Sequence, residues 1–161
     1  MTEGLSKAIS LRTEGKGDEA LGLLRTILWN SPENPHVNYQ MACTLDSLGK
    51  EREAIAYYEI AIERGLDGEG LRGALLGLGS SYRAIGEYEM SKQALQRGRE
   101  AFDAAREFDV FLAMALYNTN QCAEAMSLLL RVVAETSDDP GVASYRRAIL
   151  FYSDRLDQVW I

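Results

Sequence analysis

Small, large and turn-forming residues recur along the chain in the same order, and the steps between equivalent small residues are 34, 37 and 34 positions. Two series of small residues mark places where neighbouring helices approach closely, because only small side chains leave room there. The first series is Ala8, Ala42, Gly79 and Ala113, and the second is Ala20, Ala54, Ser91 and Ala125. Large apolar residues fill the space between them, namely Leu11, Leu45, Tyr82, Leu116, Leu24, Tyr58, Leu95 and Leu129. The pattern therefore predicts two helices in each of four units.

A turn-forming residue stands five positions before each member of the second series. Gly15, Gly49 and Gly86 supply the left-handed backbone that ends a helix at little cost, and Asn120 is expected to do the same in the fourth unit. The four turns are therefore expected to be alike. The units are expected at residues 1–34, 35–68, 72–105 and 106–139.

A further helix is expected after the fourth unit, over residues 140–161. Asp138 or Asp139 can cap this helix, and Pro140 suits its first turn. Apolar residues then recur at helical spacing, at Tyr145, Ile149, Tyr152 and Leu156. The charged residues between them would keep the end of the stack soluble, so we expect a terminal capping helix.

The repeat resembles that of the tetratricopeptide family, because small, large and turn positions recur together over nearly the whole chain. Segments of the C-terminal half look like a group of small stand-alone bacterial members: Phe108–Leu116, Ala134–Pro140 and Tyr145–Arg147. The resemblance implies an all-α fold, a right-handed α-solenoid of four helix-turn-helix units plus the capping helix, forming a single domain over residues 1–161. It also implies protein interaction, with dimerisation as an alternative use, and no defined activity.

Composition and charge narrow the classes of partner. The net charge is −7 and the acidic residues are scattered through the repeats, so nucleic acid is disfavoured while a basic partner is compatible. The longest uncharged run, Val110–Ala123, is too short and too polar to cross a membrane. No membrane association is therefore expected, and a cytoplasmic location is the default expectation.

Residues that would suggest catalysis, a metal site or a cofactor site do not come together in the sequence. His36, the single histidine, follows Asn34-Pro35 at the start of a helix, where a surface or capping role is expected. Cys43 and Cys122 lie two units apart, so neither a disulfide nor a zinc site is expected from them. An enzyme is therefore the least favoured class of function.

A concave groove is the candidate binding surface, because tetratricopeptide folds line it with outward-facing residues of each first helix. In this sequence those positions are mainly apolar and aromatic. We expect the groove to be lined by Leu5, Ile9, Tyr39, Gln40, Cys43, Gly73, Leu76, Gly77, Ser80, Val110, Phe111, Met114 and Tyr117, and to be extended by Tyr145, Phe151 and Tyr152. The alternative is that Val110, Phe111 and Tyr145 are partly core. Family members that clamp a chaperone's C-terminal carboxylate carry lysine, asparagine and arginine in the groove, so that role is disfavoured here.

Glycines are concentrated between Gly65 and Gly79, where the three extra residues of the third step also lie. Residues 65–70 are expected to form a loop. Gly73 and Gly77 lie one turn apart inside a helix, where each costs about 1 kcal/mol relative to alanine. With Ser80 they are expected to form a shallow notch for docking, and the alternative is close packing against the longer loop.

Two non-enzymatic functions are compatible with this sequence. The first is an interaction module that holds a helix or peptide of a protein partner in the groove. The second is a homodimer in which the groove or the capping helix packs on a second copy.

Overall fold

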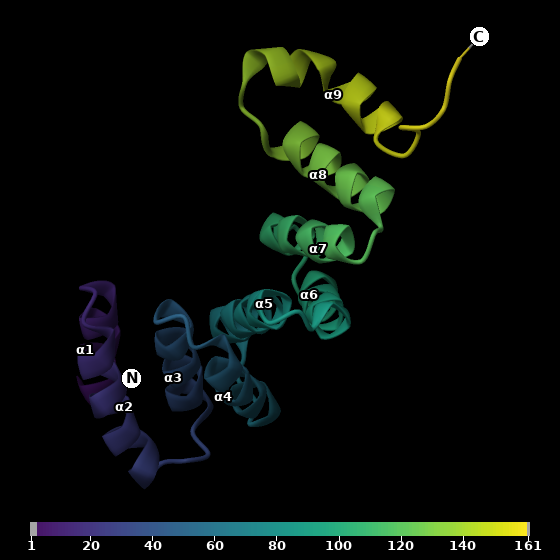
Figure 1. Ribbon diagram of the computed structural model, residues 1–161. Coiled ribbons are helices and arrows are strands. Elements are labelled where there is room, and N and C mark those ends of the chain that lie inside the picture. The colour runs from purple at the N-terminus through teal and green to yellow at the C-terminus, as the bar shows by residue number, and fades with distance from the viewer. Residues whose placement is uncertain (1–2, 161) are drawn as a thin grey trace.

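The computed structural model describes residues 3–160, in which nine helices follow one another without a strand (Figure 1). They are α1 (Glu3–Thr13), α2 (Gly17–Asn30), α3 (Pro35–Ser47), α4 (Glu51–Glu63), α5 (Gly68–Ala84), α6 (Tyr88–Ala101), α7 (Arg106–Asn118), α8 (Cys122–Thr136) and α9 (Pro140–Tyr152). Helix pairs stack on one another from α1 to α8, which makes the fold an all-α repeat solenoid. No helix in this range is both long and apolar enough to cross a membrane.

The four expected turns are confirmed. Gly15, Gly49, Gly86 and Asn120 have φ angles of 78°, 71°, 87° and 61°, in the left-handed region. In the first turn the Lys16 N–H donates to the Leu11 carbonyl at 2.8 Å, and the other three turns close with the equivalent bond. Each of these turns thus satisfies a carbonyl at the end of a first helix, as a Schellman motif does.

Asparagine or aspartate followed by proline begins both α3 and α9. The Asn34 side chain accepts hydrogen bonds from the backbone N–H groups of His36 and Val37. Asp139 accepts one from Val142, so Asp139 rather than Asp138 caps the last helix. These two helices therefore start in the same register relative to their proline.

The first helices of the units form an inner row. α1 contacts α3, α3 contacts α5 and α5 contacts α7, whereas α2, α4, α6 and α8 make no close contact with one another. Helices that touch across units lie on the inside of the curve, and those that spread apart lie on the outside. The inner row of α1, α3, α5 and α7 is therefore the concave side of the solenoid (Figure 1).

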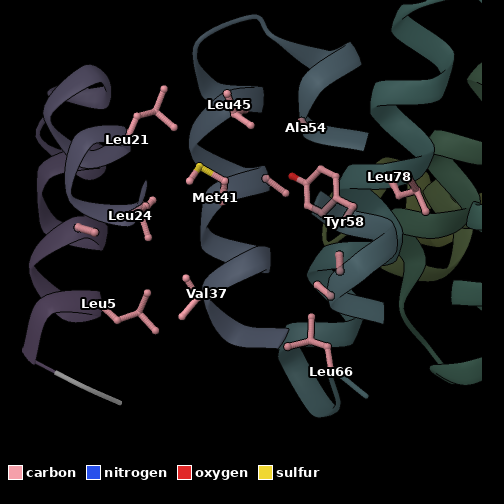
Figure 2. Packing of buried hydrophobic residues seen from close by; sticks show 14 of the residues in the cluster. Leu5, Leu21, Leu24, Val37, Met41, Leu45, Ala54, Tyr58, Leu66 and Leu78 are labelled. Atoms are coloured by element: carbon pink, nitrogen blue, oxygen red, sulfur yellow. The ribbon is translucent and has the colours of Figure 1, made fainter. Parts of the chain in front are cut away.

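The core consists of two clusters of buried side chains that meet at α5. In the N-terminal cluster Leu21 and Leu24 of α2 point toward α3, where Met41 and Leu45 meet them (Figure 2). The C-terminal cluster is built around Phe108 of α7, which is fully buried.

Phe108 packs directly against the backbone of α6. A Cβ atom on Gly98 would lie 2.0 Å from Cε1 of the Phe108 ring, so only glycine fits at that position. Phe102 stacks on the same ring at a centroid distance of 6.3 Å. The position of α7 is thus set by one aromatic side chain filling the space that one glycine leaves.

Two expectations about helix bounds are wrong. Gly65 lies in the turn between α4 and α5 as expected, but Gly68 and Gly70 are helical, so the extra residues lengthen α5 to 17 residues. The reason is Leu66, which is buried and packs against Gly70, holding the chain at the start of the longer helix. The last helix ends at Tyr152, and Leu156 lies beyond it among turns. Residue 161 of the expected helix lies outside the described residues.

Candidate functional site

Residues expected to line the groove lie on the inner helices. Ile9, Tyr39, Gln40, Cys43, Leu76, Ser80, Val110, Phe111 and Met114 are half-buried there, as are the glycines at 73 and 77. Tyr117, at the end of α7, is exposed. Phe111 is partly core, because it packs against the C-terminal cluster. The expectation that Leu5 lines the groove is wrong. Leu5 is buried in the core and points toward Val37 of α3 (Figure 2).

The glycine notch expected in the middle of the groove is filled by two tyrosines. A Cβ atom on Gly73 would lie 2.1 Å from the Tyr39 hydroxyl oxygen, and one on Gly77 would lie 2.5 Å from that of Tyr58. The two rings are 6.3 Å apart. Close packing, the alternative, is therefore what the structure shows, although tyrosines of the preceding unit occupy the space and not the loop.

A polar cluster lies beside these rings. The Tyr58 hydroxyl donates to Asp46 Oδ2 at 3.3 Å, and the Ser81 hydroxyl donates to Asp46 Oδ1 at 3.2 Å. Burial raises the pKa of the Asp46 carboxyl above its ordinary value. Burial also raises the pKa of the neighbouring Cys43 thiol, which favours its protonated form.

Buried polar atoms without a hydrogen-bond partner are confined to the inner row among the described residues. They are Arg12 Nη1, Gln40 Oε1, Arg83 Nε and Asn118 Oδ1; a fifth such atom, on Asp109, takes part in an ion pair. They lie on α1, α3, α5 and α7. The row therefore holds both donors and acceptors on half-buried side chains.

Sequence reasoning missed Arg12, Asp46 and Arg83. These residues occupy the same place in the last turn of the first three inner helices, and Tyr117 occupies it in the fourth. The sequence could have revealed them, because they stand one helical turn after expected groove residues. Those groove residues are Ile9, Cys43, Ser80 and Met114.

An ion pair joins two inner helices at the start of α7. Arg72 of α5 donates from Nε to Glu107 of α7 at 2.6 Å. The Arg72 hydrogen bond holds the pKa of the Glu107 carboxyl below its ordinary value. This contact ties the third unit to the fourth.

The three aromatic residues of the last helix lie apart from the inner row. Tyr145, Phe151 and Tyr152 are exposed, and α9 contacts α8 but not α7 (Figure 1). The rings of Phe151 and Tyr152 are 5.2 Å apart, and Trp160 contacts both. These residues form a separate apolar surface at the C-terminal end, so Tyr145 is not part of the core.

Comparison with known structures places this fold among tetratricopeptide proteins. The MamA RS-1 ArsTM double mutant is 18% identical, with 98% of both chains covered and a TM-score of 0.69. YrrB, described as a TPR protein with an unusual peptide-binding site, is 19% identical, with 94% of this chain and 77% of that chain covered and a TM-score of 0.72. TTC0263, a thermophilic TPR protein in Thermus thermophilus, is 16% identical over 92% of this chain and 97% of that chain, at a TM-score of 0.50. At these identities the likeness is one of fold.

Sequence comparison gives the family directly. No match was found among curated proteins. The sequence model of the tetratrico peptide repeat family matches residues 35–156, from the start of α3 to beyond the end of α9. Proteins of this family are generally non-catalytic interaction modules. Because the match takes in most of the chain and agrees with the repeated helix pairs and turns, the chain belongs to the tetratrico peptide repeat family.

Proposed function

We propose that the chain is a non-enzymatic interaction module that binds a peptide segment of a partner protein along the inner row of α1, α3, α5 and α7. The observation that carries this proposal is that half-buried polar side chains stand among apolar residues along the concave side of these helices. Arg12 and Arg83 offer donors, while Gln40 and Asn118 offer acceptors. A peptide backbone supplies carbonyl and N–H groups with which the guanidinium and amide groups of these side chains can pair.

Apolar residues between the polar atoms would contact the side chains of the peptide. Phe111, Met114 and Tyr117 cluster on α7, and aromatic and methionine side chains are common anchors in interfaces. YrrB has a peptide-binding site by its description, which supports this class of ligand for a chain of the same fold. The net charge of −7 favours a peptide with basic residues.

The test uses a random-peptide phage library selected against the wild-type chain, followed by fluorescence anisotropy with one selected peptide. Arg12→Met and Arg83→Met should each weaken binding about 10-fold or more, because each removes a charged donor. Arg25→Met is the matched control, since Arg25 is exposed on the outer helix α2. Phe111→Asp should abolish binding. Selected peptides that bind Arg12→Met, Arg83→Met and Phe111→Asp as tightly as wild type would overturn the proposal.

The second function expected from the sequence, self-association, finds its support on α8 and α9 and not in the groove. The cytoplasmic location stays a prediction of the sequence.

A further inference from the structure

One side of α8 carries exposed apolar residues at positions that are covered in the first unit. Leu21 of α2 is 2% exposed, because α3 of the next unit covers it (Figure 2). Met126 occupies the same position in the fourth unit and is 47% exposed. Val133, two turns further along α8, is 46% exposed. A stripe that receives a helix in the first unit is therefore left open in the last one.

The reason is that α9 cannot pack as the first helix of a fifth unit. When α3 and α9 are aligned on Pro35 and Pro140, the fully buried Met41 and Ala42 correspond to Arg146 and Arg147, which are exposed. Ala42 belongs to the series of small residues that lets neighbouring helices approach closely. An arginine at that place prevents the approach.

Instead, α9 and the turn after it lie over a different side of α8. The Ser127 hydroxyl donates to Asp154 at 2.8 Å, and Arg131 pairs with the same carboxylate. Arg146 Nε donates to the Ala134 carbonyl at 2.7 Å. Ser127 follows Met126 by one position, and Ala134 follows Val133 by one position. Both residues therefore lie about 100° around α8 from the exposed pair. The contacts of α9 thus leave Met126 and Val133 uncovered.

The C-terminal segment, α9 and the residues after it, carries exposed aromatic side chains of its own. Tyr145 and Tyr152 are seven positions apart and so lie on one side of α9. Tyr145, Phe151, Tyr152 and Trp160 are each between 48% and 69% exposed. At about 200 Å² per aromatic side chain, these four expose about 400 Å². This is about the apolar share of the roughly 800 Å² that one partner contributes to a standard interface.

We propose that two copies of the chain dimerise through their C-terminal ends, with α9 of each copy packing on the Met126–Val133 stripe of the other. One surface supplies both the open stripe and the uncovered helix, which is the self-complementarity that a two-fold interface requires. The proposal concerns a surface other than the groove and does not depend on peptide binding.

Charge at this end is compatible with a second copy as the occupant, because both signs are present in nearly equal number. Residues 131–157 hold four arginines and five acidic residues, a net charge of −1 out of −7 for the chain. A net charge of −1 over this segment opposes the approach of two copies only weakly. The outward side of α1 carries Glu3, Lys7 and Ser10, all exposed, so this side of α1 offers no apolar surface for a head-to-tail contact.

Light scattering after size exclusion, over a concentration series, tests the proposal. A monomer has a mass of 17.9 kDa, and the wild type should reach a dimer of twice that mass. Met126→Asp and Val133→Asp should each raise the dimer dissociation constant about 30-fold or more, because each places a charge at the centre of the contact. Met90→Asp is the control, since Met90 is 41% exposed on α6, away from this end. Thermal unfolding by circular dichroism should show that all three variants fold.

The exposed thiol of Cys122 gives a second readout. Cys122 precedes Met126 by one turn and lies on the same stripe, so maleimide labelling should slow as the protein concentration rises. A monomeric mass throughout the series would overturn the proposal. So would a dimer that survives Met126→Asp and Val133→Asp, or one that is lost instead with the groove variant Phe111→Asp. Growth beyond the dimer would exclude the two-fold arrangement. Because Met126→Asp leaves the groove intact, peptide binding by this variant separates the two proposals.

Discussion

Replacing Gly98 by alanine should destabilise the protein by about 2 kcal/mol, although alanine is the better helix former. The propensity gain is about 1 kcal/mol. Against it stands the added Cβ, which would meet three atoms of the Phe108 ring at 2.0, 2.4 and 2.5 Å. The ring is fully buried and stacked on Phe102, so relief requires α6 and α7 to move apart. Overpacking of this kind costs about 1–3 kcal/mol, and a rigid buried ring places the cost at the upper end.

The measurement is urea and thermal unfolding followed by circular dichroism, with Gly22→Ala as the matched control. Gly22 lies in α2, and a Cβ there would have nothing within 4 Å. This control should gain about 0.5–1 kcal/mol, whereas Gly98→Ala should lower Tm by about 4–8 °C.

A double-mutant cycle isolates the contact. In the Phe108→Leu background the cost of Gly98→Ala should fall by about 1 kcal/mol or more, because the smaller side chain leaves room for the methyl group. If Gly98→Ala is as stable as Gly22→Ala, or if the two substitutions prove additive, the steric account of how α7 is positioned is wrong.

Three further outcomes follow from the backbone and the ion pairs. Ala104 has a φ of 63°, so Ala104→Gly should stabilise the fold by about 0.5 kcal/mol in urea unfolding, and a loss of stability would contradict the strain assigned to it. Gly86 has a φ of 87°, so Gly86→Ala should cost about 1 kcal/mol by the same assay, in contrast to Gly22→Ala. Arg72→Met should lower Tm more at pH 7 than at pH 3. The pKa of Glu107 is lowered from 4.5 in the folded state, so the stability from the pair is fully present above 4.5 and is lost as the pH falls through the lower folded value. An equal Tm difference at both pH values would show that the effect is not due to the Glu107 charge.

The repeated helix pairs were predictable because their signals are local. A left-handed turn needs glycine or asparagine, and Asn120 shows that the second choice works as well as the first three glycines. What the sequence pattern could not show depends on contacts between units. The apolar spacing of Tyr145, Tyr152 and Leu156 continues past the end of α9, yet Asp154 is drawn to Ser127 and Arg131 of α8 and the helix ends.

The groove was harder to predict than the fold for the same reason. Tyr58 occupies a core position of its unit, but its hydroxyl reaches past that unit to Gly77 on α5, which no pattern within one unit reveals. Arg12 and Arg83 look like ordinary solvated residues at the ends of helices. Their buried, unpaired nitrogen atoms become visible only once the inner helices are side by side.

The longest helix, α5, determines how cooperatively the array unfolds. Ala74 and Leu78 belong to one core cluster and Leu75 to the other, so α5 is shared by both. It also holds five glycines, each of which weakens a helix by about 0.5–1 kcal/mol relative to alanine. A segment of this composition is not helical alone and depends on neighbours on both sides. If either cluster is lost, α5 loses the contacts that keep it helical. The other cluster then loses the side chains that α5 contributes to it. We therefore expect the two halves to unfold together, and we expect a fragment ending at residue 84 to have a frayed last helix.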